Sequence, residues 1–210
     1  MAKLKAPLMS LGASGALGKA LVFFPWKGID AVREYVIPSN PKTALQTTQR
    51  GYLTACVAQI HAAQALAAHP LDELDTSAYA RLGGTRKTPR TWFNEMVKLW
   101  IDCKILADKP VVYTDGTVTT ATVGAIDIEL YQLEETADDL VAGKFYFGSS
   151  KTNLIHSVAA TVTPHVSVAL AAEDCAAFLT AGVKYYFQFR PDVADDAEGA
   201  NSGIYTFVGA

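Results

Sequence analysis

Hydrophobic positions follow two different periods along the chain, and the change between them lies near residue 109. Before it, apolar residues recur at spacings of three and four, the period of an amphipathic helix. After it, short apolar runs and period-two alternation predict strands. The pattern therefore predicts an α+β, multidomain chain.

Three helices are expected in the first half of the chain. The first covers about 44–67 and the second about 71–82, where Leu71, Leu74, Tyr79 and Leu82 are expected to face inward. Thr88 as N-cap and Pro89 at the first helical position predict the start of the third helix. This helix carries an apolar stripe that we interpret as core: Trp92, Phe93, Met96, Val97, Trp100 and Ile101.

The segment before the helices predicts a glycine-rich arm and a β-hairpin. Residues 1–18 are predicted as a flexible arm, and strands at 19–24 and 29–37 flank a turn at 25–28. The apolar residues of this hairpin are not confined to one face, so it must pack on the helices or on another subunit. With the helices it makes a predicted assembly module, residues 19–108. Its expected interface is Leu21, Val22, Phe23, Phe24, Trp26, Arg33 and Tyr35.

Residues 109–210 are predicted to form an all-β sandwich. Seven short strands with turn signals between them match this architecture. They are expected at 117–123, 125–133, 144–147, 154–163, 166–170, 183–190 and 204–208.

Two parts of this domain resemble fibronectin type III domains. Residues 179–189 (LTAGVKYYFQF) look like the Leu-x-x-Gly-x-x-Tyr corner and the strand after it, and residues 202–207 (SGIYTF) are similar to the last strand. The resemblance implies an immunoglobulin/fibronectin III-like sandwich. It also implies that Leu179 and Tyr185 are buried and that the hydroxyl of Tyr185 or Tyr186 bonds to nearby backbone.

Residues 8–55 carry a second resemblance. The pieces GASGALGKALVF (12–23), WKG (26–28), VREYVIP (32–38) and NPKT (40–43) occur in an order similar to that of an uncharacterised family of bacteriophage and prophage proteins. The genes of that family lie among those for virion structural components. The resemblance implies membership of a virion and no particular chemistry.

Charge is distributed unevenly between the two halves. Residues 1–109 have a net charge of +6 and residues 110–210 of −9. We interpret four residues, Arg81, Arg86, Lys87 and Arg90, as a possible basic docking surface. Arginine is favoured at protein interfaces and no nucleic-acid motif is present, so contact with protein is preferred over contact with DNA.

Candidate chemistry is sparse. The 3 cysteines are widely spaced and suit buried thiols. His61, His69, His156 and His165 do not fall at metal-ligand spacing. The carboxylate clusters at 72–75, 134–139 and 192–198 are interpreted as solubilising charge in loops and caps, with calcium binding left as an alternative. We therefore predict no enzyme activity and no catalytic, cofactor or metal site.

These observations predict a structural component of a bacteriophage virion: a head-decoration, head–tail connection or tail-associated protein. Its expected partners are other virion proteins and copies of itself, with no small-molecule substrate. No apolar run approaches the roughly 18 residues of a membrane helix, so no membrane partner is expected. The alternative is a carbohydrate- or host-surface-binding module, built on the exposed loops expected at 192–202 and 114–117 of the sandwich.

Overall fold

The computed structural model describes residues 3–4, 13–27, 29–37, 39–40, 42–122, 125–134, 140, 142–163, 166–173, 177–192 and 201–210. The chain divides into two compact units, Met1–Ala44 and Leu45–Ala210. This division differs from the predicted boundaries after residues 18 and 108. The helices and the C-terminal strands belong to one unit because they share their hydrophobic cores, as described below.

The first unit is a four-stranded antiparallel sheet in the order β1-β2-β3-β4. Its strands are β1 (Lys3–Leu4), β2 (Ala13–Leu17), β3 (Leu21–Trp26) and β4 (Ile29–Glu34). The last two form the predicted hairpin. Where an arm was expected, β2 instead pairs with β3, and Gly18 at φ 57° turns the chain between them. That left-handed conformation suits glycine, which has no Cβ.

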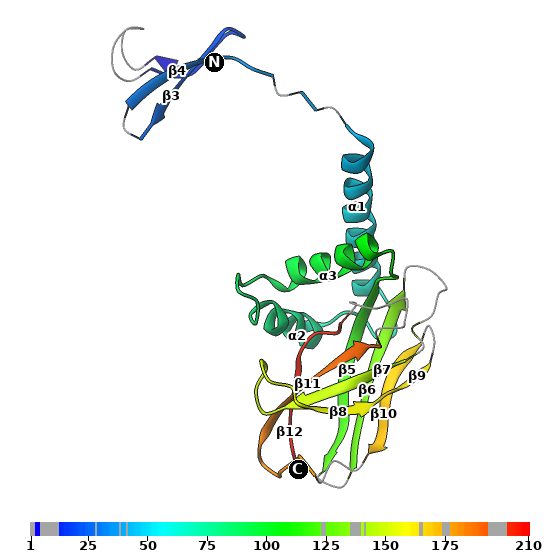
Figure 1. Ribbon diagram of the computed structural model, residues 1–210. Coiled ribbons are helices and arrows are strands. Elements are labelled where there is room, and N and C mark those ends of the chain that lie inside the picture. Colours follow the sequence, from blue (N-terminus) through cyan, green and yellow to red (C-terminus); the bar gives the residue numbers. More distant parts are fainter. Residues whose placement is uncertain are drawn as a thin grey trace. The chain divides into compact units, whose positions relative to one another are not determined.

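The second unit begins with three helices, α1 (Ala44–Gln64), α2 (Glu73–Gly83) and α3 (Trp92–Leu106). Their shared core contains Cys56 and Ile60 of α1, Tyr79 of α2, and Met96 and Trp100 of α3. The stripe predicted on the third helix is therefore confirmed as core. The first turns of α1, residues 44–51, are exposed and extend past α3 in Figure 1.

Two details of the predicted helices are wrong. Leu74, expected to face inward, is 59% exposed on the first turn of α2. The third helix starts at Trp92 with Thr91 as its N-cap, not at Pro89, because residues 84–90 form a turn that the Arg90 amide closes onto Gly83. Thr91 accepts a hydrogen bond from the Asn94 amide, which is the role of an N-cap.

Two four-stranded antiparallel sheets follow the helices. One has the order β5-β6-β10-β9 and the other β12-β11-β7-β8. Their bounds are β5 (Val111–Thr122), β6 (Ala125–Glu134), β7 (Gly143–Gly148), β8 (His156–Ala159), β9 (Thr161–Thr163), β10 (Ser167–Glu173), β11 (Lys184–Pro191) and β12 (Tyr205–Val208). All seven predicted strand positions are occupied. The run at 154–163, predicted as one strand, breaks at Ala160 into β8 and β9, which belong to different sheets.

Period-two alternation places large side chains between the two sheets. Ile126, Ile128 and Leu130 of β6 are buried, as are Phe145 of β7 and Phe187 of β11. They belong to one cluster to which both sheets contribute, so the sheets pack as a sandwich. The core is rich in aromatic contacts; the rings of Phe145 and Phe187 lie 6.1 Å apart in an edge-to-face arrangement.

The corner before β11 has the features that the resemblance implied. Leu179 and Tyr185 are both buried. The Thr180 amide donates to the Tyr185 hydroxyl at 3.0 Å, so the ring fixes the turn that enters the strand.

Helices and sandwich interlock through shared side chains. Val112 of β5 belongs to the helical core, whereas Ala78 of α2 and Cys103 of α3 belong to the sandwich core. Gly203 lies so close to α2 that a Cβ atom there would come within 2.7 Å of the Ala78 Cβ. The Ile204 amide next to it donates to the Ala78 carbonyl at 3.0 Å.

One buried carboxylate joins three elements at this boundary. Asp75, in the first turn of α2, has no exposed surface. It accepts hydrogen bonds from the amides of Asp72 at 3.1 Å, Asp115 at 2.8 Å and Gly116 at 3.2 Å, and from the Tyr205 hydroxyl at 2.8 Å. Its interpretation as solubilising charge is therefore wrong: Asp75 holds α2, β5 and β12 together.

Strand β5 contains a bulge where it contacts Asp75. The register of β5 shifts between Thr114 and Thr117, and Asp115 there has φ 48°. This bulge turns two consecutive amides toward one carboxylate. The pKa of the Asp75 carboxyl lies above its usual value, because burial raises it more than the hydrogen bonds from Tyr205 and the three amides lower it.

Replacing Asp75 is expected to destabilise the second unit strongly. Asp75→Ala leaves the buried Tyr205 hydroxyl and the part-buried Asp115 and Gly116 amides without their acceptor, and should lower the free energy of unfolding by about 3–5 kcal/mol. Asp72→Ala, which removes only the exposed N-cap of α2, should cost about 1 kcal/mol. Urea unfolding followed by near-UV circular dichroism measures both. Equal losses for the two variants would contradict the assigned role of Asp75.

Candidate functional site

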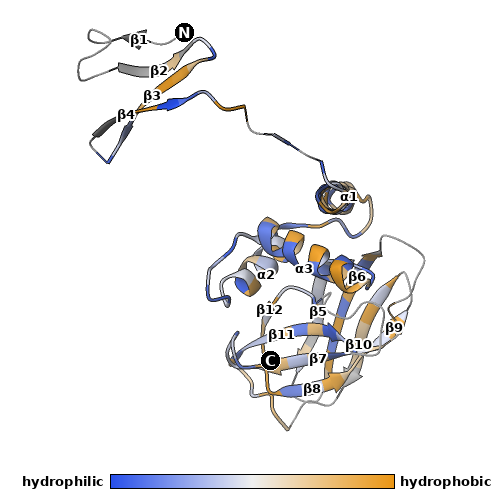
Figure 2. Cartoon of the chain, turned by 45° about the horizontal axis from the view of Figure 1, so that its top comes forward, coloured by the Kyte–Doolittle hydropathy of each residue, from blue (hydrophilic) through white to orange (hydrophobic). Residues whose placement is uncertain are grey.

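The described side chains of the N-terminal sheet form no buried core. None of the residues of this unit whose side chains the structure describes is buried. Trp26 is 62% exposed and Val32 is 53% exposed, although both are large and apolar. Figure 2 shows the hydrophobic colour along β3. Exposed apolar side chains of this size make the sheet a candidate surface for protein interaction.

Both faces of this sheet carry apolar side chains. Successive residues of a strand point to opposite faces, so Val22, Phe24 and Trp26 lie on one face of β3, and Leu21 and Phe23 on the other. Residues paired across two antiparallel strands share a face. Val32 is paired with Phe23 and therefore extends the second face.

The predicted interface residues on β4 and after it fit the same arrangement. Arg33 is paired with Val22, and its guanidinium lies 5.4 Å from the centre of the Phe24 ring. Tyr35 follows β4 directly, and its amide donates to the Ala20 carbonyl at 2.8 Å. The structure thus brings all seven predicted residues together on β3, β4 and the residue after β4. The described residues between Tyr35 and α1 are exposed, with Ile37 70% exposed.

Three of the four residues of the predicted basic docking surface make contacts within the fold. Arg86 and Arg90 both bind Glu95, which has no exposed surface, at 2.7 and 2.9 Å. Arg81 donates to the Ile204 carbonyl at 3.2 Å. Lys87 is exposed in the turn between α2 and α3. Part of this positive charge therefore stabilises the fold, because an unpaired Glu95 would be costly to bury.

Two cations that the sequence analysis did not single out lie near Arg86. Lys151 in the β7–β8 connection and Arg190 of β11 line the same cleft as Arg86. They are at least 65 positions away from it in sequence, so no local pattern reveals the grouping.

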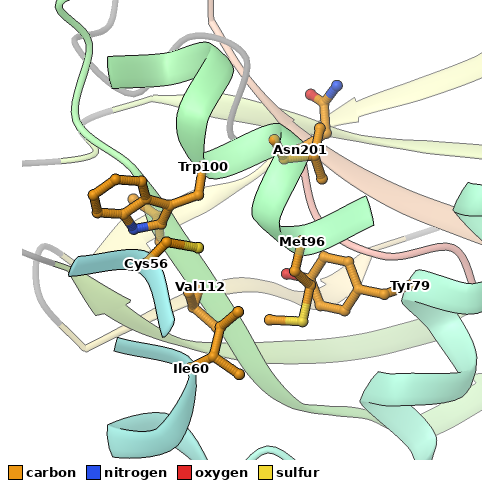
Figure 3. Close-up of a pocket in the computed structure, with 9 residues that line it drawn as sticks. Cys56, Ile60, Tyr79, Met96, Trp100, Val112 and Asn201 are labelled. Atoms are coloured by element: carbon orange, nitrogen blue, oxygen red, sulfur yellow. The ribbon is translucent and has the colours of Figure 1, made fainter. Parts of the chain in front are cut away.

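The apolar hollow between the helices and β5 is not a binding site. Cys56, Ile60, Tyr79, Met96 and Trp100 point into it (Figure 3). It encloses only about 10 Å³, space for a single water molecule at most. Its walls are the helical core, and we interpret it as a small packing gap.

The cysteine thiols in the described part of the chain are poor nucleophiles. Burial raises the pKa of Cys56 to about 12. The pKa of Cys103 also rises to about 12, chiefly through burial and further through Asp108 and Asp102. A thiol reacts as its thiolate, so both should be inert near neutral pH.

One histidine has a charged partner. His69 Nδ1 lies 2.6 Å from Asp115 Oδ2, and its ring stacks on Tyr131. Asp115 lies in the bulge of β5, and its amide binds Asp75. The His69–Asp115 pair therefore ties the α1–α2 connection to the junction of α2, β5 and β12. Among the described residues, no group of three or more histidine, cysteine or acidic side chains is arranged to hold a metal ion.

The loops expected to bind a host ligand differ from the prediction. Residues 114–117 are part of β5, and Thr114 is buried, so they do not form an exposed loop. Of the second loop, 193–200 lie outside the described residues. So do His165, Cys175 and most of the predicted acidic cluster at 134–139.

Comparisons of the chain with models of protein families, with curated proteins and with solved structures find no match. Within the described part of the chain, no helix combines the length and the apolar character needed to cross a bilayer.

Thiol labelling tests the assignment of the hollow as core. In a Cys175→Ser background, Cys56 and Cys103 should react with iodoacetamide at pH 8 about 100-fold more slowly in the native chain than in urea, because reaction requires opening of the helical core. Mass spectrometry of the labelled peptides gives the two rates separately. Labelling of native Cys56 at the rate seen in urea would contradict a closed core.

Proposed function

We propose that this chain is a structural component of a bacteriophage virion that acts through protein–protein assembly. The observation that carries the proposal is the four-stranded N-terminal sheet, which has large apolar side chains on both faces and no buried residue among those described. The resemblance of residues 8–55 to phage and prophage proteins supports the same function.

The sheet requires a partner on physical grounds. A unit of 44 residues lies near the lower limit for a domain that folds alone without disulfides or metal. Stability in a small sheet comes from a covered apolar face, and here exposed apolar side chains lie on both faces, Trp26 on one and Val32 on the other. Other virion proteins or further copies of this chain would cover them and make the sheet stable only within an assembly.

The second unit has two hydrophobic cores of its own. We propose that it is an accessory domain of the fibronectin III or immunoglobulin class. If β5 to β12 are taken as strands A, B, C, C′, D, E, F and G, the two sheets have the orders A-B-E-D and G-F-C-C′. These orders, and the tyrosine corner at Tyr185, are typical of immunoglobulin-like sandwiches.

The assignment of roles follows from this difference. Leu45–Ala210 is a self-sufficient folded body, and Met1–Ala44 supplies the adhesive surface. Repeated in a symmetric particle, the adhesive sheet gives each copy several contacts, and the avidity of the whole exceeds that of any one contact.

A variant that changes both faces of the sheet should fail to assemble. Phe23→Asp with Trp26→Ala removes one large apolar side chain from each face and places a charge on one of them. We expect the double variant to sediment as a monomer and to be lost from purified virus particles, while the near-UV spectrum of the second unit is retained. Analytical ultracentrifugation and immunoblotting of gradient-purified particles measure the two effects.

The matched control changes exposed apolar residues of the second unit. Ile155→Asp with Ile105→Ala alters side chains that are 67% and 59% exposed, and it should assemble like the unmodified chain. Normal incorporation of the Phe23/Trp26 variant, or equal loss of the control, would refute the proposed role of the sheet.

A further inference from the structure

We propose that a polar cleft on the second unit binds the phosphate or sulfate group of a small ligand. The cleft has a volume of about 380 Å³ and lies between the end of α2 and the sheet that contains β7 and β11. Its lining comes from four segments: the end of α2 and the turn after it, the β7–β8 connection, β11, and the residues before β12. This proposal is independent of the assembly function of the first unit.

Three cations from three different segments line the cleft. They are Arg86 after α2, Lys151 between β7 and β8, and Arg190 on β11. Thr85, Thr152, Gln188 and Asn201 supply further polar groups, and none of the described residues that line the cleft is acidic. Positive charges gathered in a concave site attract an anion more strongly than the same charges spread over a surface.

Arg190 is held in place by its neighbours. Its guanidinium lies 4.4 Å from the centre of the Tyr146 ring, and its Nε donates to Gln188 Oε1 at 2.9 Å. Gln188 is itself buried and fixed by a bond from its Nε2 to the Ser202 carbonyl at 2.9 Å. Because these contacts use Nε and the ring face, the two terminal nitrogens of Arg190 can serve a ligand as a fork.

The other two cations come from the turn after α2 and from the β7–β8 connection. Arg86 donates through Nε to the buried Glu95, which orients its side chain. The ammonium of Lys151 lies near the C-terminal end of α2, where a Cβ on Gly84 would come within 3.9 Å of it. Glu95 forms ion pairs with Arg86 and Arg90, so its negative charge does not neutralise Lys151 and Arg190 in the cleft.

The chemistry of the ligand follows from these donors and from the size of the cleft. Arginine forks match the oxygens of a tetrahedral anion, and a lysine adds a mobile positive charge. A volume of about 380 Å³ suits a small molecule or one sugar unit. A nucleic-acid strand requires an extended basic track, and the net charge of −9 on residues 110–210 opposes a long polyanion.

Titration of the full chain with defined anions tests the proposal. Inorganic phosphate, inorganic sulfate, glucose 6-phosphate and glucose 6-sulfate should each give saturable binding by isothermal titration calorimetry or by amide shift changes, at constant ionic strength set with sodium chloride. Tighter binding of glucose 6-phosphate than of glucose 6-sulfate identifies a phosphorylated ligand, and the reverse order identifies a sulfated one.

Variants locate the binding in the cleft. Lys151→Gln, at an exposed position, should weaken binding about tenfold, the effect of losing one charge-assisted contact. Arg190→Lys keeps the charge, loses the fork, and should also weaken it. Lys184→Gln removes one charge from an exposed position at the start of β11, away from the cleft, and should leave affinity unchanged. No saturable binding, equal binding by Lys151→Gln, or tighter binding of a single-stranded oligonucleotide than of every small anion would overturn the proposal.

Discussion

The Asp75 carboxylate lies where α2, β5 and β12 meet, and four hydrogen-bond donors point at it. Two of the donors are consecutive amides of a bulge, so the register of β5 and the position of α2 depend on the same group. Around this junction the cores interlock, with Val112 reaching into the helices and Cys103 into the sandwich. The second unit is a single body because its helices and strands share hydrophobic cores and because the buried Asp75 carboxylate links α2, β5 and β12.

The described residues of the first unit form no comparable centre. Its strands are joined by backbone hydrogen bonds, and none of the side chains that the structure describes there is buried. The sequence VFFPW at 22–26 alternates within an apolar run, so each face of the sheet receives aromatic or aliphatic groups. The second unit buries large apolar side chains in its cores, whereas the described part of the sheet leaves such side chains exposed. This difference is the basis for proposing that the second unit serves as a platform and the sheet as an adhesive surface.

The sequence predicted the elements well and the long-range contacts poorly. Period-two alternation located every strand position of the sandwich, and the spacing of Met96 and Trp100 located the helical core, because both signals are local. The break at Ala160, the burial of Asp75 and the pairing of Arg86 with Glu95 depend on neighbours that local patterns do not specify. Asp75 illustrates the limit: an acid in the first turn of a helix is normally a solvated cap, and only the fold turns the β5 amides toward it.

The two candidate surfaces also differ in how far the sequence could predict them. The seven predicted interface residues cluster because they are adjacent in sequence or paired in one hairpin. The basic cleft was not predicted, since Arg86, Lys151 and Arg190 meet only through tertiary structure. A group of residues in one hairpin can thus be predicted from sequence, whereas the partners of scattered charges are set by the whole fold.

Hydrogen exchange tests the central claim most directly, namely that the N-terminal sheet is stable only when it is covered. In the dilute, monomeric chain the amides of β3 and β4 should exchange at least about 100-fold faster than those of α3 and β11, and they should become protected in the assembled particle. If the β3 and β4 amides are already as protected in the monomer as those of β11, the sheet is stable by itself and the assembly role proposed for it is contradicted.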